Sequence, residues 1–170
     1  MKPRTQVKGV PYTRRKYMRG FPPPKINKFT MGNPTASFEY QVSLISKKDA
    51  QISHNALEAA RIGVNRLLEG KLGRENYCLQ IAPYPHHILR ENKMIFGAHA
   101  DRLQDGMRKA FGKPIGTAAR IKADQAIIRV TVNENGVDVA KEALKRGGIK
   151  LPMVYRIKIE EAKEEEKENV

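Results

Sequence analysis

The sequence predicts an α+β fold, in which a mostly antiparallel sheet has two helices packed on one face (an α/β sandwich) and follows a basic extended N-terminal arm. Three observations lead to this prediction. Several short segments alternate between apolar and polar residues, two longer segments repeat apolar residues with helical spacing, and proline and basic residues crowd the first thirty positions. Because two helices cannot cover both faces of a sheet with five or more strands, we expect the other face to be open.

The arm, residues 1–34, differs in composition from the rest of the chain. Its first thirty residues contain nine basic residues and no acid, and residues 22–24 are a run of three prolines. Such proline density is incompatible with a helix or a central strand, and like charges repel, so we expect the arm to order only against a polyanion. A functionless disordered tail is the alternative. Three aromatic residues among the charges favour a polyanion-binding arm over a functionless tail, since their rings could stack or pack: Tyr12, Tyr17 and Phe21.

The body, residues 35–159, begins with a strand and a helix. Apolar residues alternate with polar ones through Phe38, Tyr40, Val42 and Leu44, which predicts a half-buried strand over residues 37–46. The apolar spacing then becomes helical over residues 53–68, with Ser53 as the N-cap and Gly70 as the stop. A short strand is predicted over residues 77–82, and residues 88–96 are expected to add one or two more.

The second half of the body repeats the strand–helix–strand order after a loop. The loop is predicted over residues 98–117, and a strand follows it over residues 118–132. Asn135-Gly136 indicates a turn before a helix over residues 137–145, which Gly147-Gly148 are expected to close. A last strand is predicted over residues 153–159. The tail, residues 160–170, has six Glu among eleven residues and is predicted to be disordered, with no function assigned to it.

The charge balance indicates a polyanionic partner. The chain has 32 Lys and Arg against 18 Asp and Glu, giving a formal net charge of +14 and a pI of about 10.0. Nucleic acid is the commonest such partner, and an anionic membrane is the alternative. No apolar run approaches the roughly 18 residues that span a bilayer, and no apolar segment of a secretory signal follows the basic N-terminus. The single cysteine, Cys78, excludes an internal disulfide and fits a reducing cytoplasm.

No enzyme motif is present in the sequence, so we predict no catalysis, no cofactor and no metal. Gly112-Lys113 is followed by Pro114 and does not form a phosphate-binding loop. His86 and His87 are adjacent, which is not the helical spacing of metal ligands, and Cys78 sits in an apolar run typical of a core. His54 and His99 could act as acid or base groups, but no carboxylate pair or nucleophile accompanies them.

The loop at residues 98–117 is the candidate site, together with the arm. It is rich in glycine and cations, which suits contact with phosphates, although a solvated surface loop is the alternative and Arg102-Leu103-Gln104 could begin a short helix. The candidate RNA-binding residues of the arm are Arg4, Lys8, Arg14, Arg15, Lys16, Arg19, Lys25 and Lys28. Those of the loop and the residues after it are Arg102, Arg108, Lys109, Lys113, Arg120 and Lys122.

Several motifs resemble one ribosomal family over residues 3–159. They are residues 100–104 (Ala-Asp-Arg-Leu-Gln), 106–108 (Gly-Met-Arg), 110–114 (Ala-Phe-Gly-Lys-Pro) and 54–61 (His-Asn-Ala-Leu-Glu-Ala-Ala-Arg), with the arm motif Tyr12-Thr13-Arg14. The family is the archaeal and eukaryotic large-subunit protein called L-ten-e, the counterpart of bacterial L-sixteen, and the likeness is greatest to its archaeal branch. The tail lies outside the resemblance.

The resemblance implies a structural constituent of the large subunit of cytoplasmic ribosomes. Such a protein has an α/β sandwich, binds large-subunit ribosomal RNA near the 5S RNA region and contacts neighbouring ribosomal proteins. It lies near the A-site tRNA, and its central loop, here residues 101–113, points toward the peptidyl transferase centre. Two other classes remain as alternatives: a free-standing nucleic-acid-binding regulator, for which no helix-turn-helix, RRM or KH motif is present, and an RNA-modifying enzyme.

Overall fold

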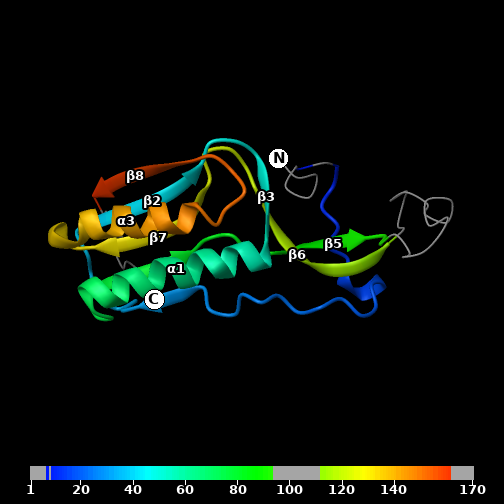
Figure 1. Cartoon of the computed structure of the whole chain (residues 1–170), viewed down its shortest axis with the longest axis horizontal. Helices are drawn as coiled ribbons and strands as arrows, with labels where there is room; N and C mark the ends of the chain where they lie inside the picture. Colours follow the sequence, from blue (N-terminus) through cyan, green and yellow to red (C-terminus); the bar gives the residue numbers. More distant parts are fainter. Residues whose placement is uncertain (1–6, 8, 94–111, 162–170) are drawn as a thin grey trace, which may run out of the picture.

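The computed structural model describes residues 7, 9–93 and 112–161. Two long helices and eight strands alternate along these residues, with two short 3-10 helices (Figure 1). In chain order the elements are η2 (Arg15–Tyr17), β1 (Thr30–Gly32), β2 (Tyr40–Ser46), β3 (Ala50–Ser53), α1 (His54–Leu72), β4 (Tyr77–Ile81), β5 (His87–Glu91), β6 (Lys113–Ile121), β7 (Ala126–Val132), η3 (Glu134–Gly136), α3 (Val137–Gly148) and β8 (Tyr155–Glu161).

The strands form two antiparallel sheets. The larger sheet has five strands in the order β1-β4-β7-β2-β8, and the smaller has three in the order β3-β6-β5. All strand pairs are antiparallel, as predicted. The prediction of one sheet was wrong, because the expected strand over residues 118–132 is two strands, β6 and β7, in different sheets. A turn separates them, and Asp124 within it adopts a left-handed φ of 61°.

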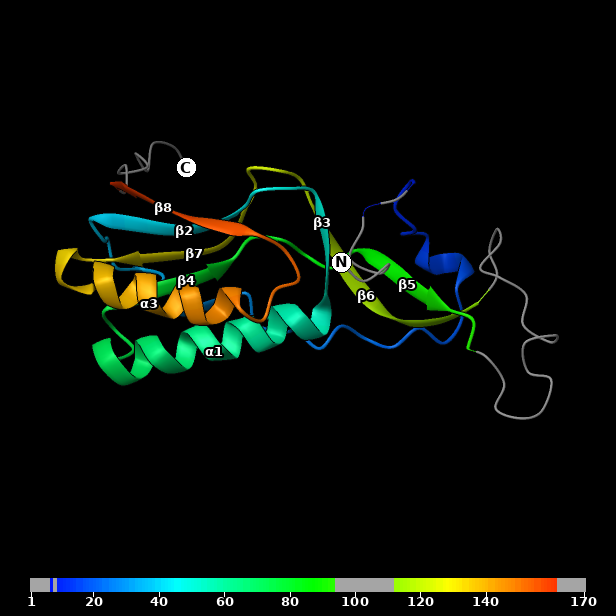
Figure 2. The same cartoon turned by 45° about the horizontal axis from the view of Figure 1, so that its top comes forward.

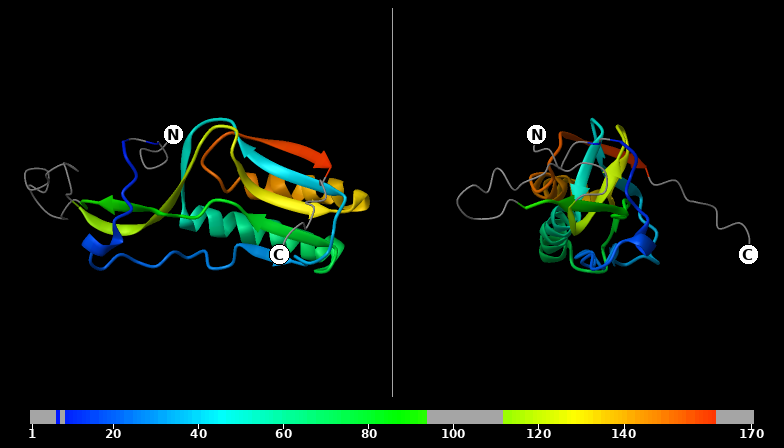
Figure 3. Two further views of the ribbon diagram at one scale, coloured as in Figure 1. Left: turned by 180° about the vertical axis from the view of Figure 1, so that it is seen from behind. Right: turned by 90° about the vertical axis from the view of Figure 1, so that its right-hand side faces the viewer.

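Both helices cover the same face of the five-stranded sheet, which confirms the predicted α+β class. Figure 1 shows α1 and α3 side by side over this sheet, and the left view of Figure 3, from behind, shows the strands in front of them. The core lies between these layers and is built from fully buried side chains of both helices and the central strands, including Leu57, Leu144, Leu44, Leu79 and Ile128. The arm contributes Ile26 and the smaller sheet Ile52 and Ile121 to the same cluster of buried residues.

The helix ends differ in part from those predicted. Ser53 caps α1 as expected, since its hydroxyl accepts the N–H of Ala56 at 3.4 Å, but the helix continues past Gly70 to Leu72. Gly147 and Gly148 belong to α3 and do not follow it. A Cβ at Gly147 would lie 2.4 Å from Cγ2 of Val64, so glycine permits the close approach of α3 to α1.

Two strands, β1 and β3, were not predicted, and the expected loop is shorter than residues 98–117. β1 pairs with β4 through Thr30 and Gln80, so part of the arm belongs to the larger sheet. The expected loop was wrong at its end, because residues 113–117 already pair within β6. Residues 94–111, which hold the rest of the loop, lie outside the described residues, as does the tail beyond residue 161.

The β5–β6 hairpin extends beyond the end of the five-stranded sheet. Figure 2 shows it on the side away from β8 and α3, with the arm folded beside it. The loop between its strands in the sequence contains Arg102, Arg108 and Lys109. These three residues lie outside the described part of the chain.

Candidate nucleic-acid interface

The arm docks on the smaller sheet through its backbone. The N–H of Tyr12 donates to Nδ1 of His87 at 2.8 Å, and the N–H of Ile88 donates to the carbonyl of Tyr12 at 2.9 Å. Tyr12 therefore pairs with consecutive residues of β5, much as an added strand would.

Arg120, a predicted RNA-binding residue on β6, holds the same part of the arm. Its Nη1 donates to the carbonyl of Gly9 at 2.6 Å, its Nη2 donates to the carbonyl of Val10 at 3.4 Å, and its Nε donates to Oε1 of Gln51 at 3.2 Å. From β5, the guanidinium of Arg90 lies over the ring of Tyr12, 4.7 Å from its centroid. The guanidinium of Arg120 is thus occupied by main-chain acceptors of the arm.

A second attachment lies at the start of α1. The N–H of Lys25 donates to Nδ1 of His54 at 2.8 Å, and the next residue, Ile26, is almost completely buried. The ring of His54 fits against β6 because residue 116 is glycine, where a Cβ would lie 2.8 Å from Nε2 of His54. We call His54, His87 and Arg120 the arm clasp.

Both histidines of the arm clasp must be neutral to accept a backbone N–H. Burial and, to a smaller extent, the positive charges of Arg120 and Arg90 together lower the pKa of His87 to about 4. Burial also lowers the pKa of His54, with the charge of Lys25 as a smaller cause. At neutral pH the electrostatics of the site therefore keep the two acceptors available.

The docked arm leaves most of its cations in solvent. Five of the predicted residues are exposed, and none of them forms an ion pair with a carboxylate among the described residues: Arg14, Lys16, Arg19, Lys25 and Lys28. Arg15 is half-buried, with its guanidinium 5.4 Å from the centroid of the Phe21 ring, and its Nη2 is buried with no hydrogen-bond partner in the described part of the chain. Arg4 and Lys8 lie outside the described residues.

The structure brings η2 of the arm beside the outer part of the β5–β6 hairpin. The views in Figures 1 to 3 agree on this arrangement, in which η2 lies near the outer end of β5 and β6. Lys122 lies at the opposite end of β6, exposed, in the turn whose backbone is fixed by Gln125. Arg102, Arg108 and Lys109 lie between the two strands in the sequence and outside the described residues.

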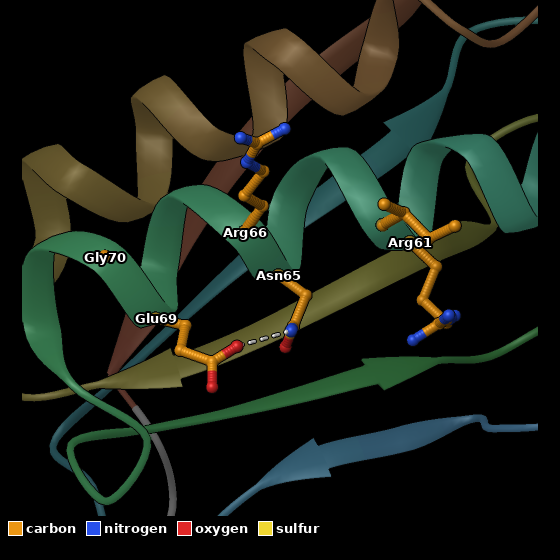
Figure 4. Close-up of a pocket in the computed structure, with 6 residues that line it drawn as sticks. Arg61, Asn65, Arg66, Glu69 and Gly70 are labelled. Carbon is orange, nitrogen blue, oxygen red and sulfur yellow. Dashed lines mark hydrogen bonds between the residues drawn. The ribbon is translucent and has the colours of Figure 1, made fainter.

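The outer face of α1 carries a shallow hollow whose polar groups largely satisfy one another (Figure 4). Asn65 donates to Oε2 of Glu69 at 3.1 Å and accepts the hydroxyl of Tyr77 at 2.8 Å, while Arg61 is paired with Glu58. The side-chain hydrogen bond to Glu58 raises the pKa of Arg61. Nothing in this hollow combines a nucleophile with a base, so it does not have the character of an active site.

Two further findings concern only the residues that the structure describes. No group of three or more His, Cys, Asp or Glu side chains is arranged to hold a metal ion among residues 7, 9–93 and 112–161. Within the same ranges, no helix is both long and apolar enough to cross a membrane.

Sequence reasoning missed the two histidines that hold the arm. His54 was considered only as an acid or base group, and His87 only as an unsuitable metal ligand. The local sequence contains no signal for their roles, because each accepts a main-chain N–H from a residue at least 29 positions away. The proline-rich segment before His87 is the one hint of a fixed backbone.

The fold and the exposed cations define a class of protein: a basic α+β body with an arm and a hairpin suited to a polyanion. The comparisons with known proteins specify it further. The model of the family "Ribosomal protein L16p/L10e" matches residues 7–158, so the chain belongs to this family. The resemblance found in the sequence is thereby confirmed.

Curated relatives are similar over almost the whole chain. The large ribosomal subunit protein uL16 of Hyperthermus butylicus is 54% identical over 159 residues, which cover 94% of this chain and 88% of that protein. The uL16 proteins of Staphylothermus marinus and Methanococcus maripaludis are 54% and 50% identical, each over 90% of this chain and 88% of the relative. All three organisms are archaea, in agreement with the expected archaeal branch.

Proposed function

We propose that the protein is a non-enzymatic structural constituent of the large subunit of cytoplasmic ribosomes and binds ribosomal RNA. The observation that carries the proposal is the docked arm, whose backbone is fixed while its cations face solvent. Family membership over residues 7–158 supports the same assignment.

Phosphate contacts carry the affinity in this proposal. The five exposed arm cations, with Lys113 and Lys122, neutralise phosphates, and Arg4, Lys8, Arg102, Arg108 and Lys109 extend this set beyond the described residues. Arg15, half-buried with its guanidinium near the ring of Phe21, joins this set. Arg120 contributes to RNA binding indirectly, because its guanidinium holds the backbone of the arm in place.

The placement in the subunit follows the family resemblance. We propose that the protein lies near the A-site tRNA and the 5S RNA region, beside other ribosomal proteins, with residues 101–113 directed toward the peptidyl transferase centre. The β5–β6 hairpin, which extends beyond the five-stranded sheet, supports this placement, since that segment connects its two strands in the sequence.

The test is binding of the purified protein to large-subunit ribosomal RNA across a salt series, with bulk tRNA as the competitor. We expect preference for the ribosomal RNA and a steep fall in affinity with salt, because each neutralised phosphate releases counterions. The triple variant Arg14→Ala, Lys16→Ala, Arg19→Ala should show a shallower slope than the control Lys145→Ala, Arg146→Ala, Lys150→Ala, which removes the same number of exposed charges at the end of α3. A flat salt dependence or no preference would refute the proposal.

A further inference from the structure

The link between β4 and β5 presents aromatic rings to solvent on a fixed backbone. In residues 82–86 the two prolines, Pro83 and Pro85, are buried, whereas Tyr84 and His86 are exposed, Tyr84 over 39% of its surface. The N–H of Ala82 donates to the carbonyl of Ile127 at 3.0 Å, and that of His86 donates to the carbonyl of Tyr84 at 3.0 Å. The smaller rings therefore anchor the link, and the larger aromatic groups point away from the core.

Tyr84 and His86 form a continuous row with Phe29 of the arm. The rings of Phe29 and Tyr84 are stacked, with centroids 5.3 Å apart and planes at 28°, and those of Tyr84 and His86 are 4.5 Å apart at 47°. Phe29 is fixed at the inner end, because its carbonyl accepts the N–H of Ile81 at 2.8 Å and its ring packs against the core. We call these three residues the aromatic row.

Two exposed cations of the arm precede the aromatic row in the sequence. Lys28, adjacent to Phe29 in the chain, and Lys25 are both exposed, and neither forms an ion pair within the described residues. At the other end of the row, His86 is followed by His87, which holds the arm at Tyr12. A partly exposed row of rings, with Phe29 and Tyr84 stacked and His86 tilted, and cations close to it in the sequence match a ligand that is both flat and anionic.

We propose that the aromatic row is a stacking site for an unpaired RNA base, with Lys25 and Lys28 neutralising the phosphates beside that base. The proposal rests on the proposed RNA binding and adds a mode of contact that phosphate neutralisation does not provide. The base must be unpaired, because bases within a duplex are already stacked on both sides. His86, at the exposed end of the row, and the accessible part of Tyr84 provide the stacking surface.

The chain contains no tryptophan, so a single substitution creates a specific reporter. In Tyr84→Trp, we expect a single-stranded decaadenylate to quench the fluorescence saturably and a ten-base-pair RNA duplex to quench it much less. The matched control is Ile149→Trp, which places the same fluorophore at a residue 76% exposed at the end of α3. Equal quenching of both reporters, or equal quenching by single strand and duplex, would show electrostatic binding alone and overturn the proposal.

The contribution of the rings is measured by affinity for the decaadenylate. Tyr84→Ala and His86→Ala should each weaken binding by about five-fold or more, while Tyr84→Phe should keep the wild-type affinity because it keeps a ring. His86→Ala keeps the test decisive if Tyr84→Ala does not fold, since the exposed His86 ring contributes little to the core. Unchanged affinity in His86→Ala, or no binding of the decaadenylate to the wild type, would overturn the stacking site.

Failure of this proposal is distinguishable from failure of the proposed function. If large-subunit RNA binds with a steep salt dependence while the alanine variants behave as wild type, only the stacking site is wrong. If large-subunit RNA does not bind at all, the proposed function fails as well. Loss of incorporation into subunits without loss of oligonucleotide affinity would assign the aromatic row to a protein contact and overturn the stacking site.

Discussion

Replacing His87 with Leu should weaken the docking of the N-terminal part of the arm without unfolding the body. The substitution removes the Nδ1 acceptor that lies 2.8 Å from the amide nitrogen of Tyr12 and leaves an apolar side chain of similar size. The backbone bond from Ile88 to the carbonyl of Tyr12 and the contacts of Arg120 remain, so the docked arm is weakened and not abolished.

The expected magnitude follows from the fate of the Tyr12 amide. Leaving a buried donor without a partner costs about 1–3 kcal/mol. An arm at the surface can instead move away from the sheet far enough for water to accept the hydrogen bond of the Tyr12 amide. We therefore expect about 1 kcal/mol, at the lower end, which corresponds to about a five-fold shift toward the detached arm.

Amide hydrogen exchange at Tyr12 and Ile88 measures this shift directly. In His87→Leu both amides should lose about five-fold in protection, while amides in the centre of α1 and β7 keep theirs. His86→Leu is the matched control, since His86 is adjacent, exposed and makes no described hydrogen bond to the arm through its ring. His87→Asn should restore part of the protection, because an amide oxygen can accept the same N–H.

Two outcomes would refute this reasoning. Equal protection at Tyr12 in His87→Leu and the wild type would mean that the histidine does not hold the arm. Loss of protection throughout the body would mean that His87 supports the core, and the arm clasp would have to be redefined.

Three further predictions concern protonation, packing and charge. The His87 ring should titrate in NMR spectra with a midpoint near pH 4, and the chemical shift of the Tyr12 amide should change with the same midpoint. Because folding lowers this pKa, the stabilisation from neutral His87 is complete above about pH 6.5 and is lost as the pH falls toward 4. Gly147→Ala should lower the free energy of unfolding, measured by chemical denaturation, by about 1–3 kcal/mol, because the added Cβ would overlap Val64. The control Gly63→Ala should be neutral or slightly stabilising, because no atom lies within 4 Å of the position of its Cβ. Replacing Arg102, Arg108, Lys109 and Lys113 with Ala should leave cooperative unfolding unchanged and weaken RNA binding. Loss of cooperativity would contradict the assignment of these residues to RNA binding, the first three from the loop and Lys113 from the exposed start of β6.

The elements that were predicted correctly are those with a long local pattern. The alternation around Val42 and Leu44 is sufficient to locate β2, and the helical spacing that includes Val64 and Leu67 is sufficient to locate α1. The predicted half-burial of β2 was wrong, because Ser43 on its other face is buried as well. β3 has only four residues and is fixed by pairing with β6, almost 70 positions later. No local pattern encodes such a strand.

The glycines and the arm show two further limits of the sequence. Gly147 and Gly148 were read as a helix stop, since glycine often follows a helix, but here they serve tight packing against Val64 and Tyr155. The arm's cations were recognisable from composition. Its docking was not, because the groups that the arm clasp contacts are peptide N–H and C=O groups, which every non-proline residue carries.

Because the arm clasp contacts main-chain groups, the position of the arm does not depend on which side chains the arm carries. The arm clasp forms hydrogen bonds with the main chain at Gly9, Val10, Tyr12 and Lys25. The side chains at 14, 16 and 19 can therefore be substituted without moving the backbone that carries them. Arms with different spacings of charge could be grafted onto one unchanged body. Selection or design can therefore change the pattern of positive charge on the arm independently of the fold.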